Sequence, residues 1–241
     1  MTATTTRRLA LIGMGRMGRV LAELAPERGW QVVARIDSSG NDRGRGITAE
    51  SLAGADVAIE FTAPRATVAN VKAAVVARCP IVVGTTGWND ELPALATWVG
   101  EHDGALLTAP NFSLGVNAFE QIVALASRLL ATAPGFDAHL VETHHAAKKD
   151  APSGTALTLA RAGSQSWHGD IPISSVRTGN VPGTHELIFD APFETIHLTH
   201  TARDRRVFAE GALVAAGWLI GRHGVYTMRD VLDTPVEAVG A

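Results

Sequence analysis

A short apolar run that ends in a glycine-rich loop limits most strongly what this chain can fold into. Residues 9–12 are all apolar, and the loop after them, Gly13-Met14-Gly15-Arg16-Met17-Gly18, has the spacing G-x-G-x-x-G. Such a run is typical of a strand that is buried on both faces of a parallel sheet. The glycines allow a tight turn and let a pyrophosphate approach the N-terminus of a following helix. The pattern predicts a dinucleotide site; a glycine-rich turn without a ligand is the alternative.

Strands and helices alternate over the first half of the chain. The predicted strands are 9–12, 31–36, 57–61, 81–83 and 105–108, and the predicted helices are 17–25, 66–77 and 91–99. This order predicts a parallel sheet that is covered by helices on both faces. Asp37 follows the second strand, 19 residues after Gly18. An acidic residue at that position binds the ribose hydroxyls of adenosine.

The alternation stops after Asn111. Predicted helices at 116–131 and 155–162 enclose a strand at 139–142, and strands at 173–177, 186–190 and 195–201 follow without helices between them. Consecutive strands predict a mixed or antiparallel sheet. We therefore expect an α/β protein in which a Rossmann-type parallel-sheet domain, residues 1–112 and 205–241, carries an inserted α+β domain, residues 113–204.

Composition excludes several classes of protein. The net charge of −3 lacks the basic excess of a nucleic-acid binder. No run of eighteen apolar residues is present, so we expect no membrane span. The single cysteine, Cys79, excludes an internal disulfide framework and a multi-cysteine zinc site, and it suits a reducing compartment. We expect a cytoplasmic protein without nucleic-acid or membrane partners.

Two further loops follow predicted strands. They are Glu60-Phe61-Thr62-Ala63-Pro64 and Gly84-Thr85-Thr86-Gly87. The carboxyl ends of the strands line the ligand crevice of an open parallel sheet. In the first loop, Thr62 could equally be the N-cap of the next helix. The second loop suits a close approach of nicotinamide to its backbone, or a simple turn.

The densest chemistry lies in residues 142–156, which read E-T-H-H-A-A-K-K-D-A-P-S-G-T-A. Ser153 is expected to cap a helix, and the N–H groups of Gly154 and Thr155 at its positive end predict an anion site. The preceding histidines and lysines predict a cationic surface for carboxylates, with proton donors alongside. Adjacent histidines on an extended chain point to opposite sides, and no nearby cysteine completes a zinc set, so we expect no metal.

This segment resembles the signature of the dihydrodipicolinate reductase family, E-x-H-H-x-x-K-x-D-x-P-S-G-T-A. Other matching segments cover most of the chain: residues 15–18, 61–62, 84–87, 111–117, 177–179, 200, 208–209 and 228–232. The resemblance implies NAD(P)H-dependent hydride transfer to a small cyclic dicarboxylic imine, giving tetrahydrodipicolinate in lysine and diaminopimelate biosynthesis. It also implies that residues 113–204 bind substrate and assemble a homotetramer, with a hinge between the domains.

The resemblance further implies roles for individual residues. His144 is similar to the family's proton donor and Lys148 to its second catalytic residue, although the sequence does not rank these two roles. The implied substrate contacts are His145, Ser153, Gly154, Thr155 and Arg205. The implied cofactor contacts are Gly13, Gly15, Arg16, Met17, Gly18, Asp37, Phe61, Thr62, Gly84, Thr85, Thr86, Asn111 and Phe112. The remaining candidates, interpreted as structural or surface residues without a catalytic role, are His168, His185, His197 and His223.

The coenzyme and the reaction each have an alternative. Ser38 follows Asp37 where NADPH-favouring members often place arginine, so we expect NADH to be favoured or tolerated. Arg16, Arg19 or Arg35 could still bind a 2′-phosphate. A non-catalytic NAD-binding sensor would share the fold, but it would not need residues 142–155 to be complete. An aspartate dehydrogenase should lack that segment altogether.

Overall fold

The computed structural model describes residues 6–234, so the outer ends of the predicted dinucleotide-binding domain, 1–5 and 235–241, lie outside the described residues. Two compact units share the chain. Unit 1 comprises the described residues up to Ser113 and those from Phe208 onward, and unit 2 is Leu114–Val207.

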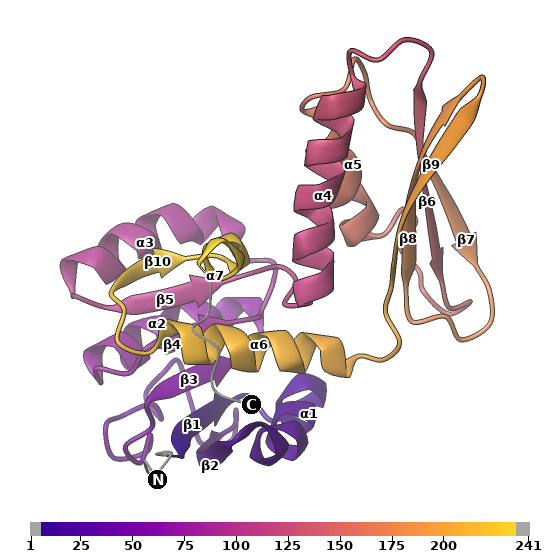
Figure 1. Ribbon diagram of the computed structural model, residues 1–241. Coiled ribbons are helices and arrows are strands. Elements are labelled where there is room, and N and C mark those ends of the chain that lie inside the picture. The colour runs from indigo at the N-terminus through magenta and orange to yellow at the C-terminus, as the bar shows by residue number, and fades with distance from the viewer. Residues whose placement is uncertain (1–5, 235–241) are drawn as a thin grey trace, which may run out of the picture. The chain divides into compact units, whose positions relative to one another are not determined.

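The sheet of unit 1 is parallel throughout (Figure 1). Its strands are β1 (Arg7–Ile12), β2 (Trp30–Ile36), β3 (Val57–Glu60), β4 (Ile81–Val83), β5 (Ala105–Thr108) and β10 (Gly224–Tyr226). They are arranged in the order β10-β5-β4-β3-β1-β2. The chain leaves β1 for β2 on one side and continues with β3 on the other. The carboxyl ends of β1 and β3 therefore form the switch point at which sheets of this type bind ligands.

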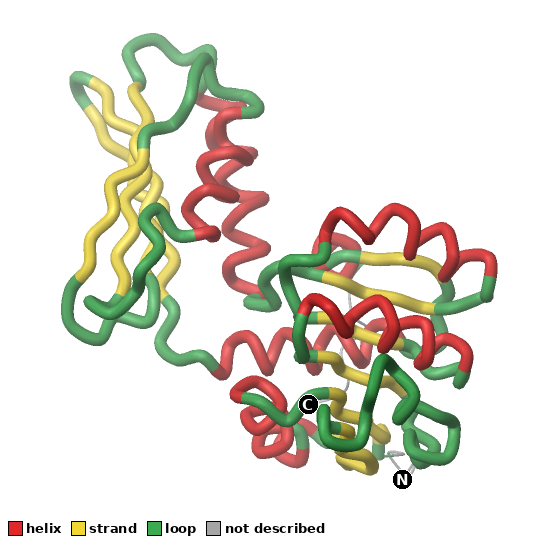
Figure 2. The backbone as a smooth tube through the Cα atoms, turned by 180° about the vertical axis from the view of Figure 1, so that it is seen from behind, coloured by secondary structure: helices red, strands yellow, loops and turns green. Residues whose placement is uncertain are grey.

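Helices cover both faces of this sheet (Figures 1 and 2). They are α1 (Arg16–Leu24), α2 (Pro64–Val76), α3 (Leu92–Glu101), α6 (Arg206–Leu219) and α7 (Met228–Asp233), with short 3₁₀ turns at η1 (Pro26–Arg28) and η2 (Asn89–Glu91). Ala10 and Ile12 pack with α2 and α3 residues in one cluster, and the alternate residues Leu9 and Leu11 are equally buried. Burial of successive residues requires cover on both faces, as the apolar run 9–12 predicted.

Unit 2 is a four-stranded mixed sheet with two helices. Strands β6 (Asp137–His144), β7 (Ile173–Arg177), β8 (Thr184–Ala191) and β9 (Glu194–Thr201) have the order β7-β6-β8-β9. The β6–β7 pair is parallel, and the other two pairs are antiparallel. Helices α4 (Leu114–Leu130) and α5 (Gly154–Ser164) lie together on one face of the sheet (Figure 2). A core that includes Phe119, Leu140 and Phe189 fills the space between them.

The predicted fold class is confirmed: a Rossmann-like parallel sheet is accompanied by a second unit with a mixed sheet. Two local expectations were wrong. Strand β10 was not predicted, because it is only three residues long and only half-buried. Strand β6 runs from Asp137 to His144 rather than over 139–142, and its burial alternates strictly. Glu142 and His144 therefore share the inner face of the sheet with apolar Leu140. None of the helices in residues 6–234 is long and apolar enough to cross a membrane.

Candidate active site

The glycine-rich loop follows β1 at the carboxyl edge of the unit 1 sheet. Gly13 has a φ of +93°, and a Cβ there would lie 2.1 Å from the carbonyl oxygen of Phe61. A Cβ on Gly18 would lie 2.0 Å from the carbonyl oxygen of Gly13, whereas Gly15 faces open space. Packing within the protein thus requires Gly13 and Gly18. Gly15 leaves the N-terminus of α1 accessible, which is what close approach of a phosphate needs.

Asp37 lies beside this loop, directly after β2. Its exposed carboxylate accepts hydrogen bonds from the backbone N–H of Ser38 at 2.9 Å and of Met14 at 3.4 Å. The acidic group expected to meet a ribose is therefore adjacent to the loop expected to meet a pyrophosphate. Arg16 is exposed and Met17 half-buried, both in the first turn of α1.

The loops after β3, β4 and β5 pack against one another. A Cβ on Gly84 would lie 2.0 Å from the ring of Phe61, so glycine is required for that ring to pack there. Phe61 in turn meets Phe112 edge-on, with ring centroids 6.0 Å apart. The backbone N–H of Thr62 donates to the hydroxyl of Thr85 at 2.7 Å. Three loops that are distant in sequence therefore form one continuous surface.

Two more predicted cofactor residues belong to these loops. Thr86 is exposed next to Thr85, and Asn111 is half-buried, with its side-chain oxygen accepting from the N–H of Ser113 at 2.8 Å. All thirteen residues predicted to contact the cofactor therefore lie at or just beyond the carboxyl ends of five successive strands. That is the edge at which dinucleotides bind to sheets of this topology.

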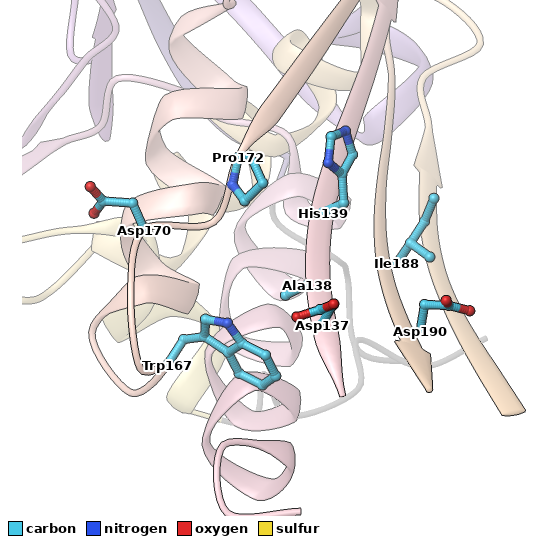
Figure 3. Close-up of a pocket in the computed structure, with 8 residues that line it drawn as sticks. All are labelled: Asp137, Ala138, His139, Trp167, Asp170, Pro172, Ile188 and Asp190. Atoms are coloured by element: carbon cyan, nitrogen blue, oxygen red, sulfur yellow. The ribbon is translucent and has the colours of Figure 1, made fainter. Parts of the chain in front are cut away.

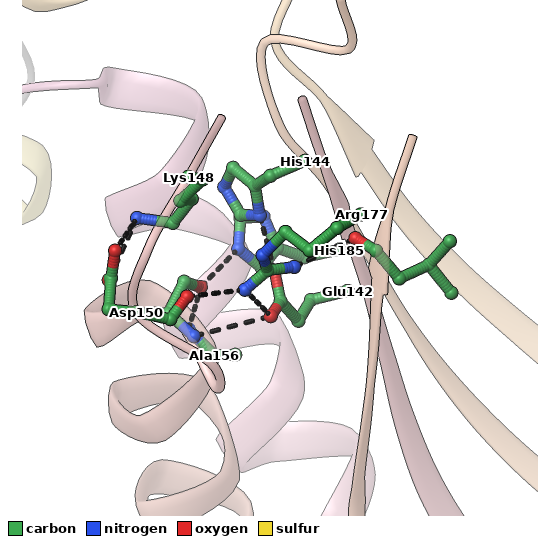
Figure 4. A network of polar contacts seen from close by, with 9 residues as sticks. Glu142, His144, Lys148, Asp150, Ala156, Arg177 and His185 are labelled. Carbon is green, nitrogen blue, oxygen red and sulfur yellow. Dashed lines mark hydrogen bonds and ion pairs between the residues drawn. The ribbon is translucent and has the colours of Figure 1, made fainter. Parts of the chain in front are cut away.

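A buried carboxylate organises the candidate chemistry in unit 2 (Figure 4). Glu142 is 0% exposed. Its Oε1 accepts from the guanidinium of Arg177 at 2.6 Å and from the N–H of Ser153 at 3.3 Å, and its Oε2 is hydrogen-bonded to Nδ1 of His144. Burial raises the pKa of Glu142, but hydrogen bonds from Arg177, Ser175 and His144 outweigh burial and lower that pKa to about 2. Glu142 is therefore a fixed negative charge beneath the imidazole.

The bond to Glu142 determines which nitrogen of His144 is available. Because a carboxylate only accepts, Nδ1 carries the hydrogen and Nε2 is left to accept or deliver a proton. Burial lowers the pKa of the His144 ring, the positive charges of Lys148 and Arg177 lower it further, and Glu142 raises it. The net pKa lies below the ordinary value of 6.5. His144 is thus mainly neutral at pH 7 until more negative charge arrives.

Lys148 contributes a cation to the same region, on the loop after β6. Its ammonium contacts both carboxylate oxygens of Asp150, at 2.7 and 2.8 Å, and lowers the pKa of Asp150. Arg177 also donates to the carbonyl oxygen of Asp150 at 2.6 Å, which ties this loop to β7. His145 is half-buried at the beginning of the loop, and its carbonyl oxygen accepts from the N–H of Lys148 at 3.0 Å.

Helix α5 begins beside this cluster. Ser153 is 2% exposed and is the N-cap, because its hydroxyl accepts from the N–H of Ala156 at 3.2 Å. Gly154 is exposed and Thr155 half-buried in the first turn. The first N–H groups of an α-helix have no acceptor within the helix and carry its positive partial charge. The start of α5 can therefore receive an anion next to His144 and Lys148.

Sequence reasoning missed two members of the cluster, Arg177 and His185. His185 was interpreted as structural or surface, yet it lies opposite Glu142 in the antiparallel β6–β8 pair. Its ring centroid is 5.2 Å from that of His144, and its Nε2 is 3.3 Å from the hydroxyl of Ser153. Burial lowers the pKa of His185 to about 4. His185 is two residues before apolar Leu187 and four before apolar Phe189. In a strand these three residues point to the same face, so the sequence indicated that His185 faces inward.

Glu142, His144 and His185 could offer ligand atoms to a metal ion, since these atoms lie within 4.8 Å of one another. However, both oxygens of Glu142 already accept hydrogen bonds, and Arg177 supplies the positive charge. A metal at Glu142 would have to displace the guanidinium of Arg177, which is partly buried and would lose its counter-charge. The expectation of no metal stays a prediction.

Two other features of unit 2 lie apart from this cluster. Arg205 is exposed between β9 and α6, and no hydrogen bond or ion pair within residues 6–234 connects it to Glu142 or His144. A pocket of about 360 Å³ lies at the start of β6, beside Asp137, His139 and Trp167 (Figure 3). His144 is at the opposite end of that strand.

Comparison with known proteins gives the family. Residues 7–112 match the family model described as "Dihydrodipicolinate reductase, N-terminus", and residues 115–232 match its C-terminal counterpart. A 4-hydroxy-tetrahydrodipicolinate reductase of Christiangramia forsetii is 35% identical, covering 93% of this chain and 97% of its own. That of Methanoregula boonei is 38% identical over 90% of this chain and 94% of its own.

Solved structures support the fold. A dipicolinate-bound dihydrodipicolinate reductase from Paenisporosarcina sp. TG-14 superposes with a TM-score of 0.78 at 22% identity, covering 92% of this chain and 97% of the other. A diaminopimelate dehydrogenase of C. glutamicum reaches 0.53 at 14% identity, covering 96% and 100%. The chain belongs to the dihydrodipicolinate reductase family, and its activity is the family's, the NAD(P)H-dependent 4-hydroxy-tetrahydrodipicolinate reductase reaction of lysine and diaminopimelate biosynthesis.

Proposed function

We propose that the substrate binds in unit 2 between the start of α5 and the Glu142–His144 pair, and that His144 is the proton donor of the reaction. The observation that supports this most strongly is the buried Glu142–His144 hydrogen bond, which leaves Nε2 of His144 for the substrate. A helix N-terminus and two cations lie around it, and this suits a dicarboxylate. The related Paenisporosarcina enzyme was solved with dipicolinate, a planar dicarboxylate.

The substrate carboxylates would be held by the residues that the family resemblance implies. One carboxylate would lie at the start of α5, against Ser153, Gly154 and Thr155, and His145 would contact it from the preceding loop. Arg205 would contact a carboxylate from the segment after β9, where its planar guanidinium suits bidentate pairing. Arg205→Ala then raises the substrate KM, whereas an unchanged KM would make Arg205 a surface residue only.

The cofactor would bind to unit 1, across the glycine-rich loop, Asp37 and the loops after β3, β4 and β5. Bound NAD(P)H supplies the hydride from its nicotinamide C4. The chain's own residues would position the imine, exclude water and provide the cations that stabilise negative charge as the hydride arrives. The 4-hydroxyl group of the substrate leaves as water, and addition of hydride and of one proton from His144 reduces the double bond, so that tetrahydrodipicolinate is formed. Catalysis requires a state in which nicotinamide and substrate meet.

The charge of the substrate would also prepare His144 for its role. The ring has a pKa below its ordinary value in the free protein. A bound dianion favours the protonated imidazolium, because an opposite charge nearby stabilises the charged form. Lys148 would then supply fixed positive charge, or would itself be the proton donor.

The experiment is the loss of absorbance at 340 nm when NADH or NADPH is mixed with the chain and freshly prepared substrate. We expect oxidation of the cofactor only when both the chain and the substrate are present. His144→Gln is the matched control, because it retains unit 1 and should bind NADH but oxidise it at least about 10²-fold more slowly. A wild-type chain that binds NADH but never oxidises it would favour the sensor alternative.

We further propose a cytoplasmic homotetramer in which NADH is favoured or tolerated. The carboxylate of Asp37 next to Ser38 would repel a 2′-phosphate.

On the sheet of unit 2, the face opposite α4 and α5 carries Val176, which is 41% exposed, and Phe193 in the β8–β9 turn is fully exposed. Light scattering should give four times the 25.3 kDa chain mass, and Val176→Lys should lower it. A monomeric wild type would contradict the proposed assembly.

A further inference from the structure

Glu60 is a second buried carboxyl group, located in unit 1 at the carboxyl end of β3. Its side chain is 0% exposed. Oε1 is hydrogen-bonded to the hydroxyl of Thr62 and accepts from the amide of Asn70 at 3.1 Å, and Oε2 accepts from the hydroxyl of Thr85 at 2.7 Å. The hydroxyl of Thr67 is a further partner, so within the described part of the chain Glu60 has hydroxyl and amide partners but no cation.

These bonds join several segments around the proposed cofactor site. The hydroxyl of Thr85 donates to Glu60 and accepts from the N–H of Thr62. It therefore connects the loop after β3 to the loop after β4. Asn70 on α2 extends the network, because its side-chain oxygen accepts from the amide of Asn41 at 2.8 Å. Asn41 belongs to the segment after β2. The network around Glu60 therefore connects the loop after β3, the loop after β4 and, through α2, the segment after β2.

Stability alone does not explain a carboxyl group at this position. Burial raises the pKa of Glu60, which means that the fold disfavours its charge. An apolar side chain of similar volume generally serves a buried position better than an ionisable one. What an apolar side chain could not do is accept hydrogen bonds from both threonines.

We propose that Glu60 is a positioning residue for the nicotinamide cofactor. Through Thr62 and Thr85 it holds the loops after β3 and β4 in the geometry that receives NAD(P)H. Its own side chain is fully buried, so it acts through the two threonines and the backbone they carry. This inference rests on the proposed cofactor site in unit 1 and adds a residue that the family pattern of cofactor contacts does not include.

The test compares the NADH dissociation constant of the wild type, Glu60→Leu, Glu60→Gln and Ile59→Ala, measured by the fluorescence of bound NADH. Glu60→Leu removes every acceptor, so we expect NADH Kd and NADH KM to rise about tenfold or more. At saturating NADH its kcat stays within about threefold of wild type. Glu60→Gln keeps an oxygen for Thr62 and Asn70 and can donate to Thr85, so its Kd stays within about threefold.

Ile59→Ala is the matched control for loss of stability. Ile59 precedes Glu60 in β3, is 1% exposed and lies on the other face of the sheet. Its truncation costs about 2–5 kcal/mol of folding free energy, yet the NADH Kd should not change. An equal rise of Kd in Ile59→Ala and Glu60→Leu would overturn the inference, because general loosening would then suffice.

An unchanged Kd in folded Glu60→Leu would also overturn it, while leaving the proposed cofactor site intact. Should Glu60→Leu fail to fold, Asn70→Ala removes one bond to Glu60, together with the bonds of Asn70 to Thr62 and Asn41, and leaves both loops unaltered in sequence. We then expect a rise in Kd of about threefold with kcat unchanged, and no rise would overturn the inference. A wild-type chain that binds neither NADH nor NADPH would overturn the cofactor site and this inference together.

Discussion

Glu60 in unit 1 and Glu142 in unit 2 are equally buried, but their carboxyl groups have different hydrogen-bond and ion-pair partners. Glu142 has Arg177 and His144 as partners, and the pKa of Glu142 is lowered to about 2. Glu60 has only hydroxyl and amide donors, and burial raises the pKa of Glu60. Burial therefore does not determine the charge of a carboxyl group; its partners do. Glu142 supplies negative charge to the proposed proton donor, and Glu60 supplies hydrogen-bond acceptors to the two loops of the proposed cofactor site.

The two groups make opposite contributions to stability as pH changes. Glu142 has a folded pKa below its ordinary value of 4.5, so its stabilisation is present above pH 4.5 and is lost as pH falls towards 2. Glu60 has a folded pKa above 4.5, so its contribution is present below pH 4.5 and is lost as pH rises through the folded pKa.

The largest expected effect is on stability. Glu142→Gln leaves the guanidinium of Arg177, which is only 17% exposed, without its counter-charge, and breaking a buried pair costs about 3–5 kcal/mol. Glu60→Gln replaces a group that has no cationic partner, so the change should be below about 1 kcal/mol. Urea unfolding of both variants at pH 7 measures the difference. Equal losses would show that the two carboxyl groups are in equivalent environments.

Removing the proposed proton donor should have the next largest effect. His144→Gln and Lys148→Ala should each lower kcat about 10²-fold or more, the usual scale for losing a positioned acid or base. The double variant should fall short of the product of the two losses if the pair acts as a unit. Near-normal turnover in both folded single variants would leave this segment with carboxylate binding only.

Binding of a dicarboxylate should change the protonation of His144. Its pKa is below 6.5 in the free protein, and a bound dianion raises it, so binding at pH 7 should take up a fraction of one proton. Titration calorimetry with dipicolinate in two buffers of different ionisation enthalpy measures that uptake. His144→Gln should abolish the uptake and the Glu60→Gln variant should retain it. Binding without proton uptake in the wild type would remove the proposed charge coupling.

The difference in kcat/KM between NADH and NADPH should be the smallest of the predicted effects. The Asp37 carboxylate next to Ser38 favours a ribose hydroxyl over a 2′-phosphate, while two exposed arginines, Arg35 in β2 and Arg16 at the start of α1, could bind a phosphate. We expect kcat/KM for NADH to equal or exceed that for NADPH by less than about tenfold. A preference above tenfold for NADPH would contradict this interpretation of Asp37.

Local patterns in the sequence predicted the features that depend on neighbouring residues. The run 9–12 with its glycine loop predicted the first strand and turn, and the segment 142–156 predicted the cap at Ser153 and the histidine, lysine and serine beside it. Each of these depends on residues only a few positions apart. The alternation of strands and helices predicted the parallel sheet because each unit of it is also local.

The residues that sequence reasoning missed depend on contacts across the sheet. His185 meets Glu142 through the antiparallel register of β6 and β8, and Arg177 meets it through the parallel register of β6 and β7. Neither register can be derived from one strand alone. Glu60 was missed for a similar reason: its partners Thr85 and Asn70 lie 25 and 10 residues away. The side chain of Glu60 is buried because helices cover both faces of the sheet. Burial makes its hydrogen bonds costly to lose.

We predict that unit 1 governs cofactor affinity and unit 2 governs the chemistry, each through a buried carboxyl group. The most direct measurement takes NADH Kd and kcat at saturating NADH for Glu60→Leu and His144→Gln side by side. We predict that Glu60→Leu raises Kd about tenfold with kcat within about threefold of wild type. His144→Gln should lower kcat about 10²-fold with Kd unchanged. Two variants that each alter Kd and kcat to the same extent would contradict this division of roles between the two units.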